Sequence, residues 1–148
     1  MTTPYGVRPG ELTGTATFRV LPTDDFAVGP SSVTISPVAE DRALSMAYTW
    51  THPEDGEHAG LLLLGAPGED GVVAAAWIDA WHQQTVASLT GTTTDTGALV
   101  TYEYAPGWRW EIELEVSQGR PGLVMRNVVP DRDDEPGVTY DVTRTDWS

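Results

Sequence analysis

Short stretches in which apolar and polar residues alternate recur along the whole chain, at a spacing of about 8 to 12 residues. The clearest is WRWEIELEV, residues 108–116, because successive side chains of a strand point to opposite faces. One face of this segment is apolar, from Trp108 to Val116, and the other carries Arg109 and three glutamates. The charged face must lie in water, so the apolar face is predicted to line a core.

Ten segments have this strand character, and helical periodicity is hard to find. The connections between them are mostly of hairpin length, as in GAPGEDG (65–71) and SQGRPG (117–122). Both of these segments contain glycine, which supplies the positive φ that tight turns need. The predicted strands are residues 12–20, 32–38, 42–50, 59–65, 72–81, 85–92, 98–104, 108–116, 123–129 and 138–146.

Consecutive antiparallel strands joined by short turns form a meander, and a long meander removes its edges most simply by closing on itself. We therefore predict an all-β fold, an antiparallel up-and-down β-barrel of about ten strands, calycin- or lipocalin-like, in a single domain over residues 1–148. An immunoglobulin-type sandwich is the alternative. It needs crossover connections, and only PTDDFAVGPS (22–31) is long enough to indicate one.

The segment WIDAW, residues 77–81, places an acid between two tryptophans at every second position. In a strand, Trp77, Asp79 and Trp81 share one face, while His82 falls on the other. A buried carboxylate needs partners, here an arginine, tyrosine hydroxyls or a ligand, since an unpaired one is costly. Asp79 is expected to orient a polar group of a ligand, to tie the barrel to itself through an arginine, or to bond a neighbouring turn at a strand end.

A barrel of eight to ten strands has an interior wide enough for a small ligand beside the packed side chains. The segment RALSMAYTW (42–50) directs inward either Leu44, Met46, Tyr48 and Trp50 or the small residues between them. Aromatic and polar residues at alternating positions supply the predicted ligand-binding set; no catalytic or metal-binding residue is assigned. The set is Tyr48, Trp50, Trp77, Asp79, Trp81, Trp108, Trp110, Asn127 and Tyr140.

Composition and charge narrow the chemistry. The chain has no cysteine and no lysine, which excludes thiolate metal sites, a cysteine nucleophile, Schiff-base chemistry and the lysine of a phosphate-binding P-loop. A net charge of -14 repels phosphate backbones and anionic lipid, which argues against nucleic acid and membrane surfaces as partners. With no signal peptide at the start and no long apolar run, we expect a soluble, cytoplasmic protein. A homodimer is left open.

Several of these motifs together resemble the DUF1579 proteins, a bacterial family of unknown function with small barrels like those of lipocalins and fatty-acid-binding proteins. The resemblance rests on LTG (12–14), RALSMAYTW (42–50), HAGLLLLG (58–65), AAWIDAWH (75–82), Gly91, WRWEIEL (108–114), LVMRNVVP (123–130) and the final YDVTRTDW. It covers nearly the whole chain and implies a ligand-binding barrel. The G-x-W motif of lipocalins is absent, and there is no room for the helix pair that caps fatty-acid-binding proteins.

The primary expectation is a barrel that binds a small apolar or amphipathic molecule without a cofactor. A haem barrel of the nitrobindin type would need a histidine ligand from the barrel wall, for which His82 is the better candidate although it falls on the face opposite Asp79. The resemblance to such haem barrels places the ligand in the last strands, which have no histidine. A metal site would need His52, His58 and His82 to converge, although His52 and His58 are expected at a solvated rim. Two further alternatives are an enzyme that uses Asp79 for proton transfer and a filled barrel that acts as an interaction module.

Overall fold

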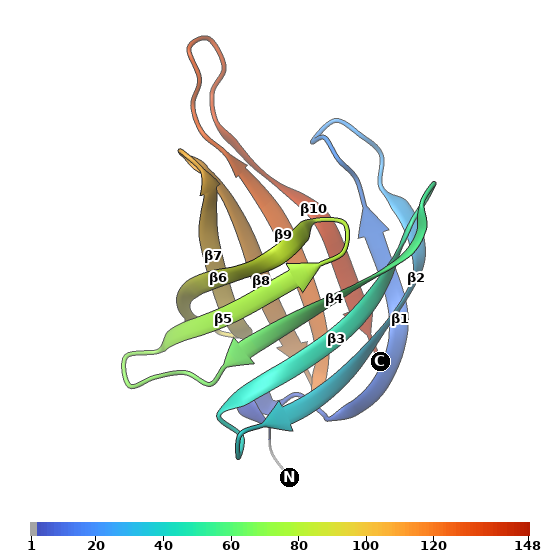
Figure 1. Ribbon diagram of the computed structural model, residues 1–148, viewed down its shortest axis with the longest axis vertical. Helices are drawn as coiled ribbons and strands as arrows, with labels where there is room; N and C mark the ends of the chain where they lie inside the picture. Colours follow the sequence, from blue (N-terminus) through green and yellow to red (C-terminus); the bar gives the residue numbers. More distant parts are fainter. Residues whose placement is uncertain (1–2) are drawn as a thin grey trace.

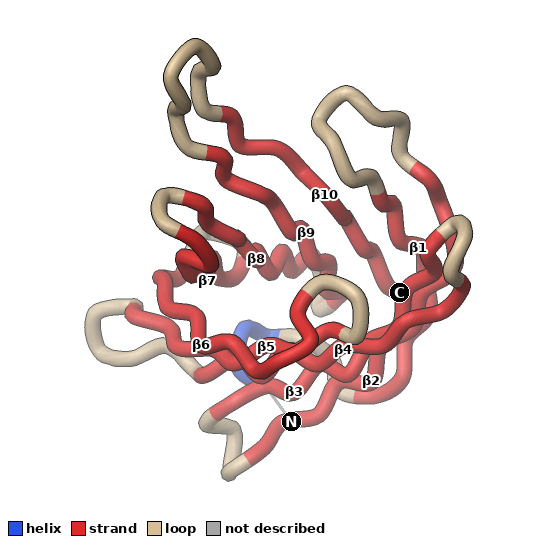
Figure 2. Tube along the Cα trace, turned by 45° about the horizontal axis from the view of Figure 1, so that its top comes forward, coloured by secondary structure: helices blue, strands red, loops and turns tan. Residues whose placement is uncertain are grey.

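The computed structural model describes residues 3–148 and confirms the predicted fold: ten antiparallel strands close into one barrel. Each strand pairs with its neighbours in the sequence, and β1 closes the ring against β10 (Figures 1 and 2). The strands are β1 (Gly10–Phe18), β2 (Ala27–Val38), β3 (Ala43–His52), β4 (Gly56–Gly65), β5 (Val72–Asp79), β6 (Gln83–Thr93), β7 (Gly97–Ala105), β8 (Trp108–Ser117), β9 (Arg120–Val129) and β10 (Val138–Trp147).

The start of β2 and the end of β5 differ from the sequence prediction. β2 begins at Ala27, so the segment read as a long connection, 22–31, is partly strand and the loop is an ordinary hairpin link. This removes the argument for a crossover, and the closed ring excludes the sandwich. β5 ends at Asp79, with an irregularity in its pairing between Trp77 and Asp79, so alternation does not extend to residue 82.

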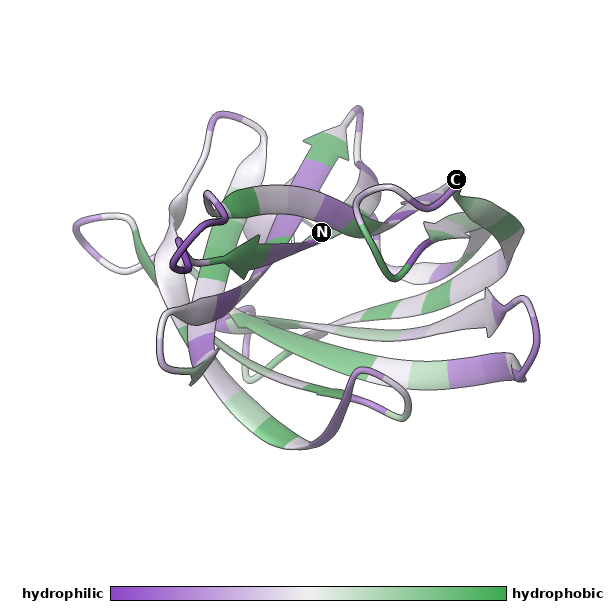
Figure 3. Ribbon diagram, turned by 90° about the horizontal axis from the view of Figure 1, so that it is seen from above, coloured by the Kyte–Doolittle hydropathy of each residue, from purple (hydrophilic) through white to green (hydrophobic). Residues whose placement is uncertain are grey.

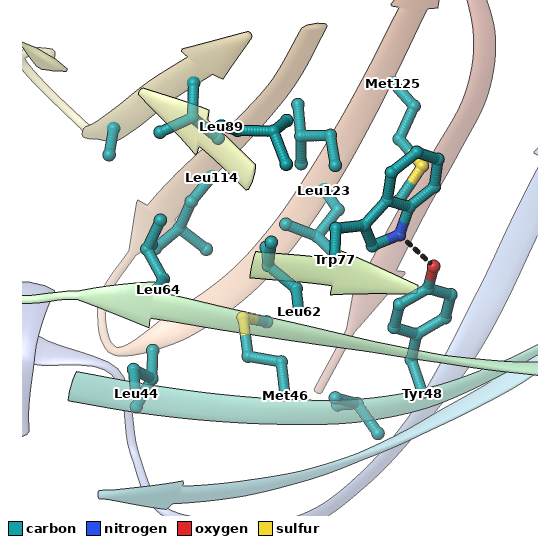
Figure 4. Close-up of a cluster of buried hydrophobic side chains, with 14 of the residues drawn as sticks. Leu44, Met46, Tyr48, Leu62, Leu64, Trp77, Leu89, Leu114, Leu123 and Met125 are labelled. Carbon is teal, nitrogen blue, oxygen red and sulfur yellow. Dashed lines mark hydrogen bonds between the residues drawn. The ribbon is translucent and has the colours of Figure 1, made fainter. Parts of the chain in front are cut away.

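The lower half of the barrel is a filled hydrophobic core. Leucines from β3, β4, β6 and β8 point inward and are almost completely buried, and Figure 4 shows several of them together with Met46 and Met125. A short 3-10 turn, η1 (Pro4–Gly6), lies at this end, where the Tyr5 hydroxyl donates to the Gly65 carbonyl oxygen at 2.6 Å. Leu44, Met46, Tyr48 and Trp50 form the inward set of β3, which settles the choice left open above.

The opposite end, which we call the aromatic end, is bounded by the loops after β1, β3, β5, β7 and β9. Figure 1 shows the loops after β1 and β9 projecting from it, and Figure 3 shows hydrophilic positions at many loop tips. Most of the tryptophans and all three histidines lie in this half. Within residues 3–148, no helix has the length and apolar character to cross a membrane.

Candidate functional site

A buried hydrogen-bonded group lies between β3 and β5, at the base of the aromatic end. Tyr48, Gly60 and Asp79 form one row across β3, β4 and β5, because Gly60 pairs with Tyr48 on one side and with Asp79 on the other. A methyl group at Gly60 would meet the Tyr48 hydroxyl at 2.4 Å. Glycine at this position therefore leaves the space through which Tyr48 crosses β4 and reaches the carboxylate.

Asp79 is only 1% exposed, and both of its oxygens are satisfied. The Tyr48 hydroxyl and the Trp50 indole nitrogen donate to Oδ2 at 2.7 and 3.2 Å. The backbone N–H groups of Trp81 and His82 donate to Oδ1 at 2.9 and 3.0 Å. Trp77 completes the group by donating its indole N–H to the Tyr48 hydroxyl at 2.8 Å, the dashed line in Figure 4.

Four donors therefore surround the Asp79 carboxyl group, two on each oxygen. Burial is the largest cause that raises the pKa of Tyr48 well above its usual range, followed by the negative charge of Asp79 and the hydrogen bond to it. Tyr48 therefore stays a neutral donor. The group joins β3 to β5 and also fixes the turn at residues 80–82. Asp79 therefore ties the barrel to itself and bonds the neighbouring turn, two of the roles considered for it.

Of the partners expected for Asp79, the arginine is wrong and the tyrosine hydroxyl is confirmed. A tyrosine, a tryptophan and two amides occupy its oxygens, while Arg126 lies on the outer wall with Glu113 at 2.8 Å and Asp141 at 2.9 Å. Because each Asp79 oxygen already accepts two hydrogen bonds, neither is free to take a proton from a substrate. This argues against the proton-transfer alternative.

His82 is the residue that the sequence placed on the wrong face. Since β5 ends at Asp79, the chain turns, and the His82 ring comes to lie on Trp50 with the centroids 5.0 Å apart and the planes at 23°. Its Nε2 atom is buried and has no hydrogen-bond partner among residues 3–148. Burial lowers the pKa of His82 to about 4, against the opposing attraction of Asp79, so the ring is neutral at pH 7.

The other two histidines are also closer to the interior than predicted. His52 and His58 are partly buried, and their rings lie 6.1 and 5.3 Å from that of Trp50. The expectation of a solvated rim is wrong because both lie on the inward face, His52 in β3 and His58 opposite Trp50 in β4. Over the described residues, no group of three or more His, Cys, Asp or Glu side chains could hold a metal ion.

The enclosed space beside Asp79 is small. Tyr48, Trp50, Asp79 and His82 line it together with residues of β9 and β10, and its volume is about 10 Å³. That is room for about one water molecule. The wide lumen expected from the strand number is thus filled by side chains at this level, which leaves no room for a ligand beside Asp79.

A larger space opens through the wall between β6 and β7. Their hydrogen-bonded ladder ends at the Thr90–Thr101 pair, although β6 begins at Gln83 and β7 runs to Ala105. The side cleft, defined by Trp77, His82, Gln83, Tyr102, Tyr104 and Trp110, has a volume of about 170 Å³. One hydrogen bond spans the gap, from the Tyr102 hydroxyl to Gln83 Oε1 at 2.5 Å.

The side cleft has aromatic walls, and two of the residues that line it, His82 and Trp110, each have a buried polar atom without a partner in the described part of the chain. Trp77 and Trp110 are stacked with their centroids 5.7 Å apart and their planes at 7°, and Tyr102 meets Trp77 edge-on at 6.4 Å. Besides His82 Nε2, the buried indole Nε1 of Trp110 has no partner in the described part of the chain. The His82 ring lines both the cleft and the small inner cavity, so it is the wall between them.

The predicted ligand-binding residues are brought to one end but fall into separate groups. Tyr48, Trp50 and Asp79 line the inner cavity, and Trp77 and Trp110 line the side cleft. The remaining four lie at the rim: Trp81 against Phe18 and His52, Trp108 near Tyr104 and Arg132, and Asn127 and Tyr140 in a hydrogen-bonded chain with Tyr104 and Val20.

Sequence reasoning missed His82, Gln83, Tyr102 and Tyr104 as cleft residues. Tyr102 and Tyr104 were visible as alternating aromatics in ALVTYEY, residues 98–104, and could have been included. The position of His82 depends on where β5 ends. The separation of β6 from β7 depends on pairing between strands, which the pattern within either strand does not contain.

No protein-family model matches the chain, and no curated protein matches its sequence. The resemblance to the DUF1579 proteins therefore stays a prediction from its motifs. The fold and the geometry of the aromatic end carry the functional argument.

Proposed function

We propose that the barrel binds a small, uncharged aromatic molecule with one hydrogen-bonding group, such as a hydroxyl, in the side cleft. The observation that carries the proposal is that two residues of this aromatic cleft, His82 and Trp110, each have a buried polar atom without a protein partner, Nε2 and Nε1, just behind the cleft surface. A buried polar group without a partner costs about 1 to 3 kcal/mol. A ligand or an ordered water molecule that bonds these atoms recovers that free energy.

The chemistry of the two atoms defines the polar group of the ligand. The indole N–H of Trp110 is only a donor, whereas the Nε2 of a neutral histidine accepts or donates according to its tautomer. A hydroxyl group can do both, so it can serve either atom. Flat rings suit the rest of the cleft, since stacked and edge-on aromatic contacts add about 0.5 to 1.5 kcal/mol beyond the burial of area.

Charge disfavours an anionic ligand such as a fatty acid. The protein carries a net charge of -14, and the side cleft contains no arginine that could pair with a carboxylate. Arg126 and Arg144 are engaged with glutamates on the outer wall. His82 is neutral at pH 7, so it supplies no positive charge either. The small apolar or amphipathic ligand expected from the sequence is therefore narrowed to an uncharged one.

The volume of the side cleft limits the size of the ligand, and the gap between β6 and β7 gives the ligand its access from solvent. A volume of about 170 Å³ lies below the roughly 300 to 1,000 Å³ of pockets for drug-sized ligands, so the ligand is small. Among residues 3–148, the Tyr102–Gln83 hydrogen bond alone spans the opening there, and its release widens the route from solvent to His82. We place this binding function in the cytoplasm, on the grounds given by the sequence.

Equilibrium dialysis with 2-naphthol and naphthalene tests the proposal, because the two probes differ only in the hydroxyl group. We expect 2-naphthol to bind about threefold to tenfold more tightly, the worth of about one hydrogen bond. His82→Phe removes Nε2 but keeps a ring of similar size, and it should abolish the preference. His58→Phe is the matched control, since His58 also has a buried Nε2 without a partner but lies outside the cleft.

The proposal is wrong if neither probe binds, or if His82→Phe keeps the full preference for 2-naphthol. Equal loss in the His58→Phe protein would also contradict it, because the effect would then come from the general packing around Trp50. The masses of the purified protein under native and denaturing conditions should be compared beforehand. A molecule that is already bound appears as a mass difference and has to be removed before the dialysis.

A further inference from the structure

Charge is distributed very unevenly around the barrel wall. The five neighbouring strands β2 to β6 contain only two Asp, Glu or Arg residues, which are Glu57 and the buried Asp79. The other five strands hold eleven such residues, including the row Glu111, Glu113 and Glu115 on β8. The outer face of β2 to β6, which we call the uncharged wall, is therefore unlike the rest of the surface of this acidic protein.

The centre of the uncharged wall is apolar. Leu61 and Leu63 of β4 point outward and are 39% and 38% exposed, and they pair across the sheet with Ile78 and Ala76 of β5. Beside them is a groove of about 320 Å³, lined by Ala59, Gly60, Leu61, Ile78, Asp79, Ala80 and Gln84. Contiguous exposed apolar surface of this kind marks sites of protein association.

We propose that the uncharged wall is the contact between two copies of this chain. Two copies of a protein with a net charge of -14 repel each other wherever their acidic strands meet. Apposition of the two uncharged walls keeps β7 to β10 of each copy on the outside of the pair. A basic partner would be drawn to the acidic strands instead, so charge favours a second copy as the occupant of this face.

Shape and size support the same occupant. A two-fold contact uses one patch on both copies, so the patch has to be self-complementary. The wall offers projecting leucines, Leu61 and Leu63, next to a recessed groove with alanines and glycine along it. Five strands about 4.8 Å apart and about 30 Å long give roughly 700 Å² of wall, and a contact between two convex barrels buries part of it, which is the size of a small, reversible interface.

Sedimentation velocity of the full chain at about 100 µM tests the proposal, since an interface with a Kd of about 1 µM is almost fully formed at that concentration. We expect twice the chain mass of 16.0 kDa. Leu61→Glu/Leu63→Glu should sediment as the single chain. The matched control is Val20→Glu/Val138→Glu, which adds the same two charges at exposed valines outside the uncharged wall and should remain a dimer.

Near-ultraviolet circular dichroism checks that each variant keeps its tryptophan packing, and Ala74→Glu, at an exposed position of β5, replaces the double variant if that protein does not fold. A wild-type protein that sediments as a single chain overturns the proposal. So does a dimer that survives Leu61→Glu/Leu63→Glu, or one that the control pair of charges dissociates equally.

Discussion

Tyr48→Phe tests the role of the buried group around Asp79, because it removes one oxygen atom and keeps the ring. Two buried partners lose a hydrogen bond at once: Asp79 Oδ2 loses its closer donor, at 2.7 Å, and Trp77 Nε1 loses its acceptor, at 2.8 Å. A hydrogen bond to a charged group is worth about 1.5 to 3 kcal/mol, and an orphaned buried donor costs about 1 to 3 kcal/mol. We expect the free energy of unfolding to fall by about 3 to 5 kcal/mol.

Urea unfolding followed by tryptophan fluorescence measures this loss. With a typical slope of about 2 kcal/mol per molar, the midpoint should fall by roughly 2 M at an unchanged slope. Tyr102→Phe is the control, because it also removes one hydroxyl, but from a less buried hydrogen bond at the mouth of the side cleft. It should cost no more than about 1 kcal/mol. A Tyr48→Phe protein that loses less than the control would refute the structural role given to Asp79.

Three further perturbations address the same end of the barrel. Gly60→Ala places a methyl group against Tyr48 and should destabilise the protein by about 2 to 4 kcal/mol in urea unfolding, whereas Gly68→Ala, whose added carbon comes no closer than 3.5 Å to its neighbours, should be nearly neutral. Equal effects would contradict the crossing of β4 by Tyr48. Trp77→Ala should cost about 3 to 5 kcal/mol by the same assay, and unchanged stability would show that the ring is not buried. The pKa of His82 is lowered from about 6.5 to about 4 in the folded protein, so the unfolded chain binds more protons between these two pH values. The contribution of His82 to the free energy of unfolding should therefore fall by about 3 kcal/mol as the pH drops through this window. His82→Phe should lack that part of the pH dependence of the unfolding free energy, and identical curves would refute the assignment.

The strands and their inward faces were predictable because each depends on local alternation. WRWEIELEV shows which side is buried within a single segment, whereas RALSMAYTW left two possible inward faces, and several of the turns between strands are marked by glycine. Asp79 was predictable as an inward residue for the same reason. A tyrosine hydroxyl was among its expected partners, but the choice of Tyr48 was not predictable, since Tyr48 lies two strands away and reaches it only through the gap left by Gly60.

The side cleft was beyond prediction for a related reason. The alternation in residues 72–81 gave no sign that β5 would end at Asp79, and one turn at that point moved His82 from the expected outer face to the interior. The early end of the β6–β7 ladder depends on pairing between segments. Such features arise from closing the barrel as a whole, so a pattern read one strand at a time misses them.

The most direct test of the binding proposal is the nitrogen-15 NMR signal of His82 Nε2 in labelled protein, recorded during a titration with 2-naphthol at pH 7. A hydroxyl that bonds this atom should move its resonance saturably, with His58 Nε2 unchanged. If 2-naphthol saturates the protein and the His82 signal stays in place, the ligand lies elsewhere and the side cleft is not the binding site.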